Sequence, residues 1–307
     1  MNLSPSTQTI LLSFDKILSH LIFLYENKNL PNKILFSGNK GIGKATLAFH
    51  LINYILSKDE EHPYDQTNLK IDKNNRSYKL TQNKSHPNFI CVDILDGKKF
   101  IDIEQIRDMI SRLEKSSFNN KPRFILIDNI ELLNLNSINA ILKILEEPSE
   151  NIFFILINNN KKNVLPTLKS RCLNYNLSLS YNETISISNK LIDMNINDLI
   201  HHELIDYYIT PGKIYNLIKF SKENNINLKD LDLKNFLELI VDNSFHKKND
   251  SFKYLIYDFI EIFLLKEISL KDIDFFNYFL KKINDVKKFN LDEESFFLEF
   301  KSKLLNG

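Results

Sequence analysis

The stretch KILFSGNKGIGKATLAFHL, residues 33–51, carries the clearest structural signal in this chain of 307 residues. Three of the chain's six glycines, Gly38, Gly41 and Gly43, lie within six consecutive residues of this stretch. Glycine alone combines free access to positive φ with close approach of the backbone to another group, so this cluster indicates a functional loop. The apolar run before the loop predicts a short buried strand, and the apolar spacing after it predicts a helix. We therefore expect a strand, a loop and a helix in succession.

Residues 38–45 read G-N-K-G-I-G-K-A and satisfy seven of the eight positions of the phosphate-loop pattern G-x-x-x-x-G-K-[ST]. Backbone N–H groups at a helix N-terminus can cradle phosphate, and Lys44 would meet the β and γ oxygens. Ala45 stands where the pattern places the hydroxyl that ligates Mg²⁺. Thr46 does not easily replace it, because one residue along a helix turns the side chain by about 100°. The alternative is a glycine-rich turn without a ligand.

Strand and helix patterns alternate over the first 180 residues, which predicts a parallel α/β sheet. The strands are continuous apolar runs, as expected when helices cover both faces of the sheet. Residues 57–88 are polar and contain two prolines, so we interpret them as an exposed insertion. The expected strands are 33–37, 89–94, 123–128, 151–157 and, with a weaker pattern, 173–179; the expected helices include 6–28, 44–56, 103–113 and 137–147.

From about residue 180 onward, apolar residues recur at helical spacing and no proline follows Pro211. This pattern predicts a small helical unit at about 180–222 and a separate helical bundle at about 223–307. The phenylalanine stripes of the bundle indicate a hydrophobic core rather than a ligand site.

Composition excludes several classes of protein. With 40 basic and 39 acidic residues, the formal net charge is +1, which rules out a protein that holds nucleic acid by global charge. Cys91 and Cys172 cannot by themselves form a disulfide framework or a zinc site, and we expect reduced thiols. The N-terminus lacks the pattern of a signal peptide, and no apolar run approaches the ~20 residues that span a membrane. We expect a cytoplasmic protein.

The strand RFILID, residues 123–128, resembles a Walker B segment with Asp128 at its metal-facing end. Many ATPases of this kind place Glu directly after that Asp to polarise the attacking water, but here the position is Asn129. Glu131 follows three positions after Asp128 and would point elsewhere if the local backbone were regular. Ala45 and Asn129 weaken metal and water activation separately, and together they argue against hydrolysis.

Four further motifs carry a family resemblance. SINAILKILEEP (137–148), VLPTLKSRC (164–172), KGIGKATLA (40–48) and HPN (86–88) resemble the clamp-loader branch of AAA+ proteins, in particular the delta-prime subunits of bacterial DNA polymerase III. The recognisable stretch covers about residues 28–180. The resemblance implies an AAA+ P-loop domain with a parallel sheet at 1–179, a small helical lid domain at 180–222 and an all-α collar domain for oligomerisation at 223–307.

The resemblance also implies residue roles. Arg171, in the SRC block, matches the arginine that reaches into a neighbouring subunit's ATP site in trans. Asn158 follows a strand at the position of the polar sensor 1 residue, although a strand-terminating Asn is an equal alternative. Lys213 is only a weak match to a second sensor arginine. The implied degenerate ATP site consists of Gly38, Gly41, Gly43, Lys44, Asp128 and Asn158, with nucleotide binding left open.

Many delta-prime relatives carry a four-cysteine zinc module after the P-loop helix. The 57–88 insertion lacks those cysteines, so we expect no zinc and no required cofactor. The implied partners are the gamma/tau motor subunits, the delta subunit, the sliding clamp and primed DNA through the assembled complex, without a membrane. The expected function is loading of the sliding clamp in DNA replication.

Two alternatives stay open. The chain could be an active motor subunit of the gamma/tau type, although such a subunit would have an intact GK[ST] and an acidic residue after Asp128. It could also be a P-loop enzyme of another class, such as a small-molecule kinase, but the LEEP and SRC blocks would then be unexplained. No set of paired carboxylates indicates a polymerase site in this chain, although the holoenzyme transfers nucleotides.

Overall fold

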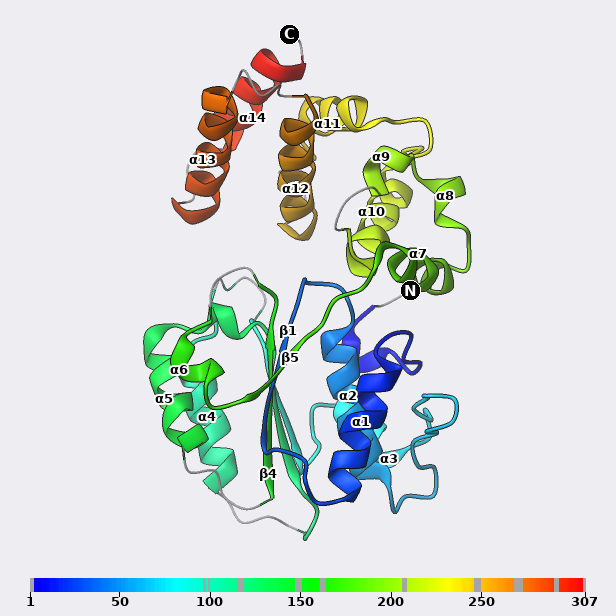
Figure 1. Ribbon diagram of the computed structural model, residues 1–307, viewed down its shortest axis with the longest axis vertical. Helices are drawn as coiled ribbons and strands as arrows, with labels where there is room; N and C mark the ends of the chain where they lie inside the picture. The colour runs from blue at the N-terminus through cyan, green and yellow to red at the C-terminus, as the bar shows by residue number, and fades with distance from the viewer. Residues whose placement is uncertain are drawn as a thin grey trace. The chain divides into compact units, whose positions relative to one another are not determined.

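The computed structural model describes residues 3–95, 98, 100–114, 119–146, 151–160, 164–205, 209–245, 250–267, 273–289 and 293–305. They belong to two compact units, Met1–Leu179 and Ser180–Gly307 (Figure 1). The last two residues of the SINAILKILEEP block, 147 and 148, lie outside the described residues.

The N-terminal unit is built on a five-stranded sheet in the order β2-β3-β4-β1-β5, and every pair of neighbouring strands is parallel. The predicted parallel α/β sheet is therefore confirmed. Because β4 lies between β3 and β1, the carboxyl ends of these three strands meet at one edge of the sheet. The strands are β1 (Lys33–Ser37), β2 (Phe89–Val92), β3 (Arg123–Ile127), β4 (Ile152–Asn158) and β5 (Leu173–Asn176).

Helices cover both faces of the sheet, and the strands bury side chains on both sides (Figure 1). In β1, Ile34 and Phe36 join one hydrophobic core while Leu35 joins the other, as the two-residue period of a strand requires. The first core includes side chains of α1 (Asp15–Glu26) and α2 (Lys44–Ser57). The second includes side chains of α4 (Ile103–Glu114), α5 (Leu135–Glu146) and α6 (Pro166–Lys169).

The helix expected at 6–28 is shorter than predicted. Pro5–Thr7 form a 3₁₀ turn, η1, and α1 begins only at Asp15. The preceding Phe14 has φ 65°, in the left-handed region, which interrupts any continuous helix at that point.

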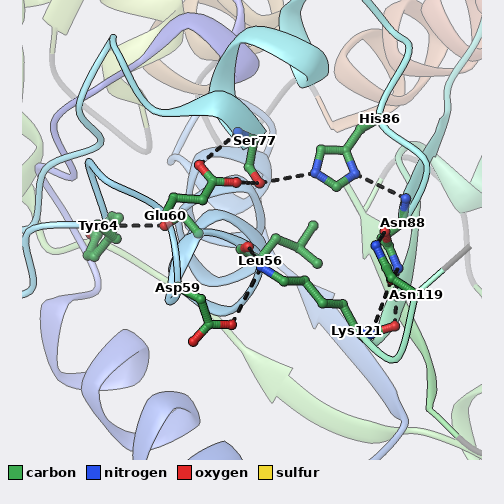
Figure 2. A network of polar contacts seen from close by, with 10 residues as sticks. Leu56, Asp59, Glu60, Tyr64, Ser77, His86, Asn88, Asn119 and Lys121 are labelled. Atoms are coloured by element: carbon green, nitrogen blue, oxygen red, sulfur yellow. Dashed lines mark hydrogen bonds and ion pairs between the residues drawn. The ribbon is translucent and has the colours of Figure 1, made fainter.

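The expectation of an exposed insertion at 57–88 is wrong in an important part. Its helix α3 (Arg76–Gln82) packs near α2, and Tyr64, Ile71, Asn75 and His86 are buried. Composition misled here because much of the buried surface is polar, and each buried polar group shown in Figure 2 finds a partner.

A chain of hydrogen bonds joins the two ends of the insertion (Figure 2). Glu60 accepts from the backbone N–H of Ser77 at 3.0 Å and from its hydroxyl at 2.6 Å. His86 Nε2 lies 3.1 Å from the Ser77 hydroxyl, and its Nδ1 accepts from the backbone N–H of Asn88 at 3.1 Å. Lys121, just before β3, donates to the carbonyl of Leu56 at 3.0 Å and ties the end of α2 to the sheet.

The C-terminal unit consists of helices packed around one hydrophobic cluster whose members run from Ile196 to Phe300. Phe236, Phe259, Phe279 and Phe297 belong to this cluster, so the phenylalanine stripes form core as predicted. The division at 222/223 stays a prediction. The helices are α7 (Tyr181–Ile192), α8 (Ile196–Leu199), α9 (His202–Ile205), α10 (Pro211–Asn224), α11 (Leu233–Asp242), α12 (Asp250–Glu267), α13 (Ile273–Phe289) and α14 (Glu293–Phe300), followed by a π-helical turn, Lys301–Leu305.

In the part of the chain that the structure describes, no helix has the length and apolar character needed to cross a membrane.

Candidate functional site

The glycine loop connects β1 to α2 at the carboxyl edge of the sheet. Gly43 caps α2 with φ 101°, a conformation that residues with a side chain rarely adopt. A Cβ on Gly38 would lie 2.2 Å from the carbonyl oxygen of Leu177 and 2.9 Å from Ile42 Cδ1. Leu177 is held there because its N–H donates to the Ser37 carbonyl at 2.7 Å. The chain just after β5 therefore requires glycine at position 38.

Lys44, the first residue of α2, is 3% exposed, and its ammonium bonds to the loop itself. Its Nζ donates to the carbonyls of Gly38 and Asn39 at 2.8 and 2.7 Å. Burial lowers the pKa of Lys44 to about 8, although the carboxylates of Asp128 and Glu131 oppose the shift. Lys44 thus stands where a phosphate-binding lysine belongs, with two backbone carbonyls as its partners.

Asp128 directly follows β3, at the same edge of the sheet as the loop. Its Oδ1 accepts from the backbone N–H of Asn129 at 2.7 Å and from the Asn159 side chain at 3.2 Å. Burial and the nearby Asp93 carboxylate raise the pKa of Asp128 to about 6, against the opposing effect of Lys44. The charged form of this carboxylate is therefore disfavoured relative to an exposed aspartate.

Asn129 links the acidic groups through its side-chain amide. Its Nδ2 donates to Asp93 Oδ1 at 2.7 Å, and its Oδ1 accepts from Asn159 Nδ2 at 3.0 Å. An amide has no useful basicity, so this residue can orient neighbours but cannot take a proton from water.

Glu131 lies in the site, contrary to the expectation that it would point elsewhere. Asn129 has φ 57°, so the local backbone is irregular, and a 3₁₀ turn, η2 (Ile130–Leu132), follows it. Glu131 is 8% exposed; its Oε2 accepts from the Asn159 backbone N–H at 3.2 Å, and its Oε1 has no hydrogen-bond partner within the described residues. Only the tolerance of Asn for the left-handed region could have signalled this arrangement in the sequence.

The asparagine that contacts Asp128 is Asn159 rather than Asn158. The Asn158 side chain donates to Asn160 at 3.0 Å, and its carbonyl accepts from the Gly38 N–H at 3.2 Å. Asn158 is therefore next to the loop, but through its backbone. The run of three asparagines indicated a polar end of the strand. A shift of one residue along a strand reverses the direction of the side chain, so the sequence could not decide whether Asn158 or Asn159 contacts Asp128.

At position 45 a methyl group replaces the expected hydroxyl. Ala45 is partly buried and packs against the core that includes α1 and α2. The loop thus offers the glycines and the lysine that a phosphate group needs, but no side-chain oxygen at the position that ligates Mg²⁺ in the pattern. The loop residues can therefore contribute to binding a phosphate group, but they do not provide the complete set of Mg²⁺ ligands in the pattern.

Arg171 lies away from this loop, just after α6. Leu168 of α6 and Ile141 of α5 join the core on the face of the sheet opposite α2. The guanidinium donates through Nη1 to the Thr167 carbonyl at 2.8 Å and through Nη2 to Glu146 Oε1 at 2.7 Å. The structure therefore does not bring Arg171 together with the other predicted site residues.

Two further residues from the sequence analysis have clear surroundings. Cys172 is buried, and burial raises the pKa of its thiol to about 11, which argues against a nucleophile. Lys213, in the first turn of α10, forms an ion pair of 2.7 Å with Asp258 of α12 inside the C-terminal unit. We therefore interpret Lys213 as part of an ion pair within the C-terminal unit.

The strand order, the phosphate loop after β1 and the acidic residue after β3 define a P-loop domain of the AAA+ class. A family model described as "DNA polymerase III, delta subunit" matches residues 14–180, more than half of the chain. The chain therefore belongs to this family, and its curated relatives identify it as a clamp-loader subunit of the delta-prime type.

Two delta-prime relatives and one gamma relative show how far the similarity extends. DNA polymerase III subunit delta' of Buchnera aphidicola subsp. Schizaphis graminum is 26% identical over 286 residues, which cover 87% of this chain and 83% of the relative. The delta' subunit of Pseudomonas aeruginosa is 30% identical over 139 residues, 45% of this chain and 40% of the relative. The gamma subunit of the same Buchnera is 29% identical over 153 residues, 49% and 39% of the two chains.

Two solved structures that align with most of this chain are a DNA polymerase III gamma subunit-related protein and a DNA clamp loader delta protein. A DNA polymerase III gamma subunit-related protein of Thermotoga maritima aligns with a TM-score of 0.48 and 17% identity, covering 92% of this chain and 97% of that one. The Bacillus subtilis DNA clamp loader delta protein aligns with a TM-score of 0.33 and 12% identity, covering 92% and 83%. The assignment of the fold rests on the sheet order and the loop, not on these superpositions.

Proposed function

We propose that this chain acts in the clamp loader as a subunit that does not hydrolyse ATP itself and supplies Arg171 in trans to the ATP site of a neighbouring motor subunit. The observation that carries the proposal is the placement of Arg171. Its guanidinium lies after α6, on the side of the sheet opposite α2, and its side chain is 33% exposed. An arginine in this place is partly exposed at the surface and remote from the chain's own phosphate loop.

The chain's own site supports the first half of the proposal. Ala45 provides no hydroxyl for Mg²⁺, and Asn129 provides no base for water. The buried ammonium of Lys44 already has two backbone acceptors, so a phosphate would have to displace them. Nucleotide binding without hydrolysis is compatible with this loop, and no cofactor is required for the role that we propose.

The chemistry of Arg171 supports the second half. A guanidinium placed beside a transferring γ-phosphoryl group neutralises the charge that develops there, and such arginine fingers raise the rate by about 10³- to 10⁵-fold. The gamma and tau subunits among the relatives of this chain are the kind of neighbour whose ATP site Arg171 would complete.

The remaining parts of the chain suit a shared ring. We propose that the C-terminal unit contributes to a collar with the motor and delta subunits, and that the assembly loads the sliding clamp onto primed DNA in the cytoplasm. A formal net charge of +1 fits a subunit whose contact with DNA is shared across several chains.

A second candidate is an active motor subunit of the gamma/tau type. One observation favours it: the Glu131 carboxylate is buried close enough to Lys44 to affect its pKa, and one of its oxygens has no partner in the described part of the chain. This carboxylate could stand in for the acidic residue missing at position 129.

Reconstitution with gamma/tau and delta subunits separates the two candidates. We expect the isolated chain to show no ATP turnover with Mg²⁺, and Arg171→Ala to remove turnover at one site of the assembled complex. Arg107→Ala provides the control, because Arg107 is an exposed arginine of α4 that pairs with Glu104 at 2.6 Å. Robust turnover by the isolated chain would favour the motor subunit, and unchanged turnover by the Arg171→Ala complex would contradict the role in trans.

A further inference from the structure

Glu146, the last residue of α5, holds the guanidinium of Arg171 on its own chain. Its Oε1 accepts from Arg171 Nη2 at 2.7 Å, while Arg171 Nη1 donates to the carbonyl of Thr167 at 2.8 Å. Both terminal nitrogens of the guanidinium are therefore engaged within the chain. An end-on, fork-shaped contact with two phosphate oxygens would use the same pair of nitrogens.

Hydrogen bonds anchor the backbone just before Glu146 and on either side of Arg171. Lys33 of β1 donates to the Leu145 carbonyl at 2.9 Å, which anchors the end of α5 beside Glu146. The Asn174 side chain donates to the carbonyls of Lys169 and Cys172, each at 2.9 Å, and so clamps the turn that carries Arg171. None of these anchoring hydrogen bonds uses the side chain of Arg171 or Glu146. The pair can therefore open by rotation of the long Arg171 side chain alone.

The exposure of the pair sets its strength. The side chains of Arg171 and Glu146 are 33% and 53% exposed. Ion pairs this exposed shift an equilibrium by about fivefold at most, because water competes for both partners and salt screens them. Such a pair can restrain the guanidinium in the free chain and still yield to the higher negative charge of a triphosphate.

We propose that Glu146 is a latch for Arg171, because its carboxylate holds the guanidinium at the surface of α5 and α6. A phosphoryl group bound to a neighbouring subunit must then displace that carboxylate from Arg171. This inference rests on the proposed role of Arg171 in trans. It makes Glu146 a positioning residue, because it acts on the reacting phosphoryl group only through Arg171.

The latch can be tested in the isolated chain by the reactivity of Arg171 toward phenylglyoxal, a reagent for free guanidinium groups, followed by peptide mass spectrometry. Glu146→Gln keeps the size of the side chain and removes its charge. We expect it to raise the modification rate of Arg171 by up to about fivefold at low salt, and less as salt rises. The matched control is Glu104→Gln, which should accelerate Arg107 and leave Arg171 unchanged. An unchanged rate at Arg171 in the Glu146→Gln chain would overturn the latch.

The reconstituted complex tests the consequence for function. We expect Glu146→Gln to lower KM for ATP by up to about fivefold with kcat retained, and the double variant with Arg171→Ala to behave as Arg171→Ala alone. A Glu146→Gln complex with unchanged or raised KM would overturn the latch while leaving the role in trans intact. Turnover unaffected by Arg171→Ala would overturn both proposals together.

Discussion

Replacing Asp128 by Asn should stabilise the isolated chain at neutral and alkaline pH. Burial and the Asp93 carboxylate raise the pKa of Asp128 from 3.8 to about 6 in the folded chain. A carboxyl group whose pKa is raised by folding binds its proton more tightly in the folded state, so its ionisation above pH 6 disfavours folding. Asn carries no charge at any of these pH values and removes this contribution.

The magnitude follows from the size of the shift. A rise of about two pKa units corresponds to about 3 kcal/mol in the free energy of unfolding once Asp128 is ionised, at about 1.4 kcal/mol per unit. The advantage of Asp128→Asn should therefore be about 3 kcal/mol at pH 8 and should fall to about 1 kcal/mol at pH 4.5, where the folded carboxyl is protonated. The oxygen of Asn can keep the hydrogen bonds from the Asn129 N–H and the Asn159 side chain.

Urea denaturation followed by circular dichroism at pH 8 and pH 4.5 measures both values. Asp108→Asn is the control, because Asp108 is an exposed carboxylate of α4, and we expect its effect to be small at both pH values. If Asp128→Asn were less stable than the parent at pH 8, or its advantage did not depend on pH, the electrostatic reasoning for this site would be refuted.

Two further predictions concern the insertion and the glycine loop. Burial lowers the pKa of His86 from 6.5 to about 4, so the stability that depends on its neutral imidazole is lost as pH falls from 6.5 towards 4. Between pH 7 and pH 5, the parent should therefore lose about 2 kcal/mol more stability than His86→Gln in urea denaturation. Equal losses in the two chains would contradict this reasoning. Gly38→Ala should destabilise the chain by about 1–3 kcal/mol, because the new Cβ would meet the Leu177 carbonyl. Gly212→Ala, in the first turn of α10, is the control and should be neutral or slightly stabilising. If thermal unfolding showed Gly212→Ala to be the less stable of the two variants, the steric explanation would be excluded.

Local sequence patterns predicted the sheet and the phosphate loop well. The strand at 33–37, the start of the helix at Lys44 and the parallel sheet follow from apolar runs and from three clustered glycines. These signals involve residues close together in sequence, and the steric requirement at Gly43 is visible in its φ of 101°.

Parts of the site depend on contacts that no local pattern encodes. Glu131 enters the site because Asn129 adopts a left-handed conformation, and Asn159 reaches Asp128 because of where β4 ends. The pairing of Arg171 with Glu146 joins residues 25 positions apart in sequence. Each of these outcomes depends on backbone geometry or tertiary packing rather than on residue spacing.

The partly buried insertion, residues 57–88, shows the same limit. Glu60, Ser77 and His86 are polar residues that composition assigns to the surface, yet they partner one another beside α2 (Figure 2). Polar groups can be buried when each finds a hydrogen-bond partner, and such partners become visible only once the chain is folded.

The central claim is that Arg171 of this chain completes the ATP site of a neighbouring subunit, while the chain does not hydrolyse ATP at its own phosphate loop. The most direct measurement is a structure of the assembled clamp loader trapped with a non-hydrolysable ATP analogue and Mg²⁺. We predict that the Arg171 guanidinium lies about 3 Å from the γ-phosphate oxygens bound to the adjacent motor subunit, detached from Glu146. An Arg171 still paired with Glu146 and remote from every bound triphosphate, together with Mg²⁺ fully coordinated at this chain's own loop, would contradict the claim.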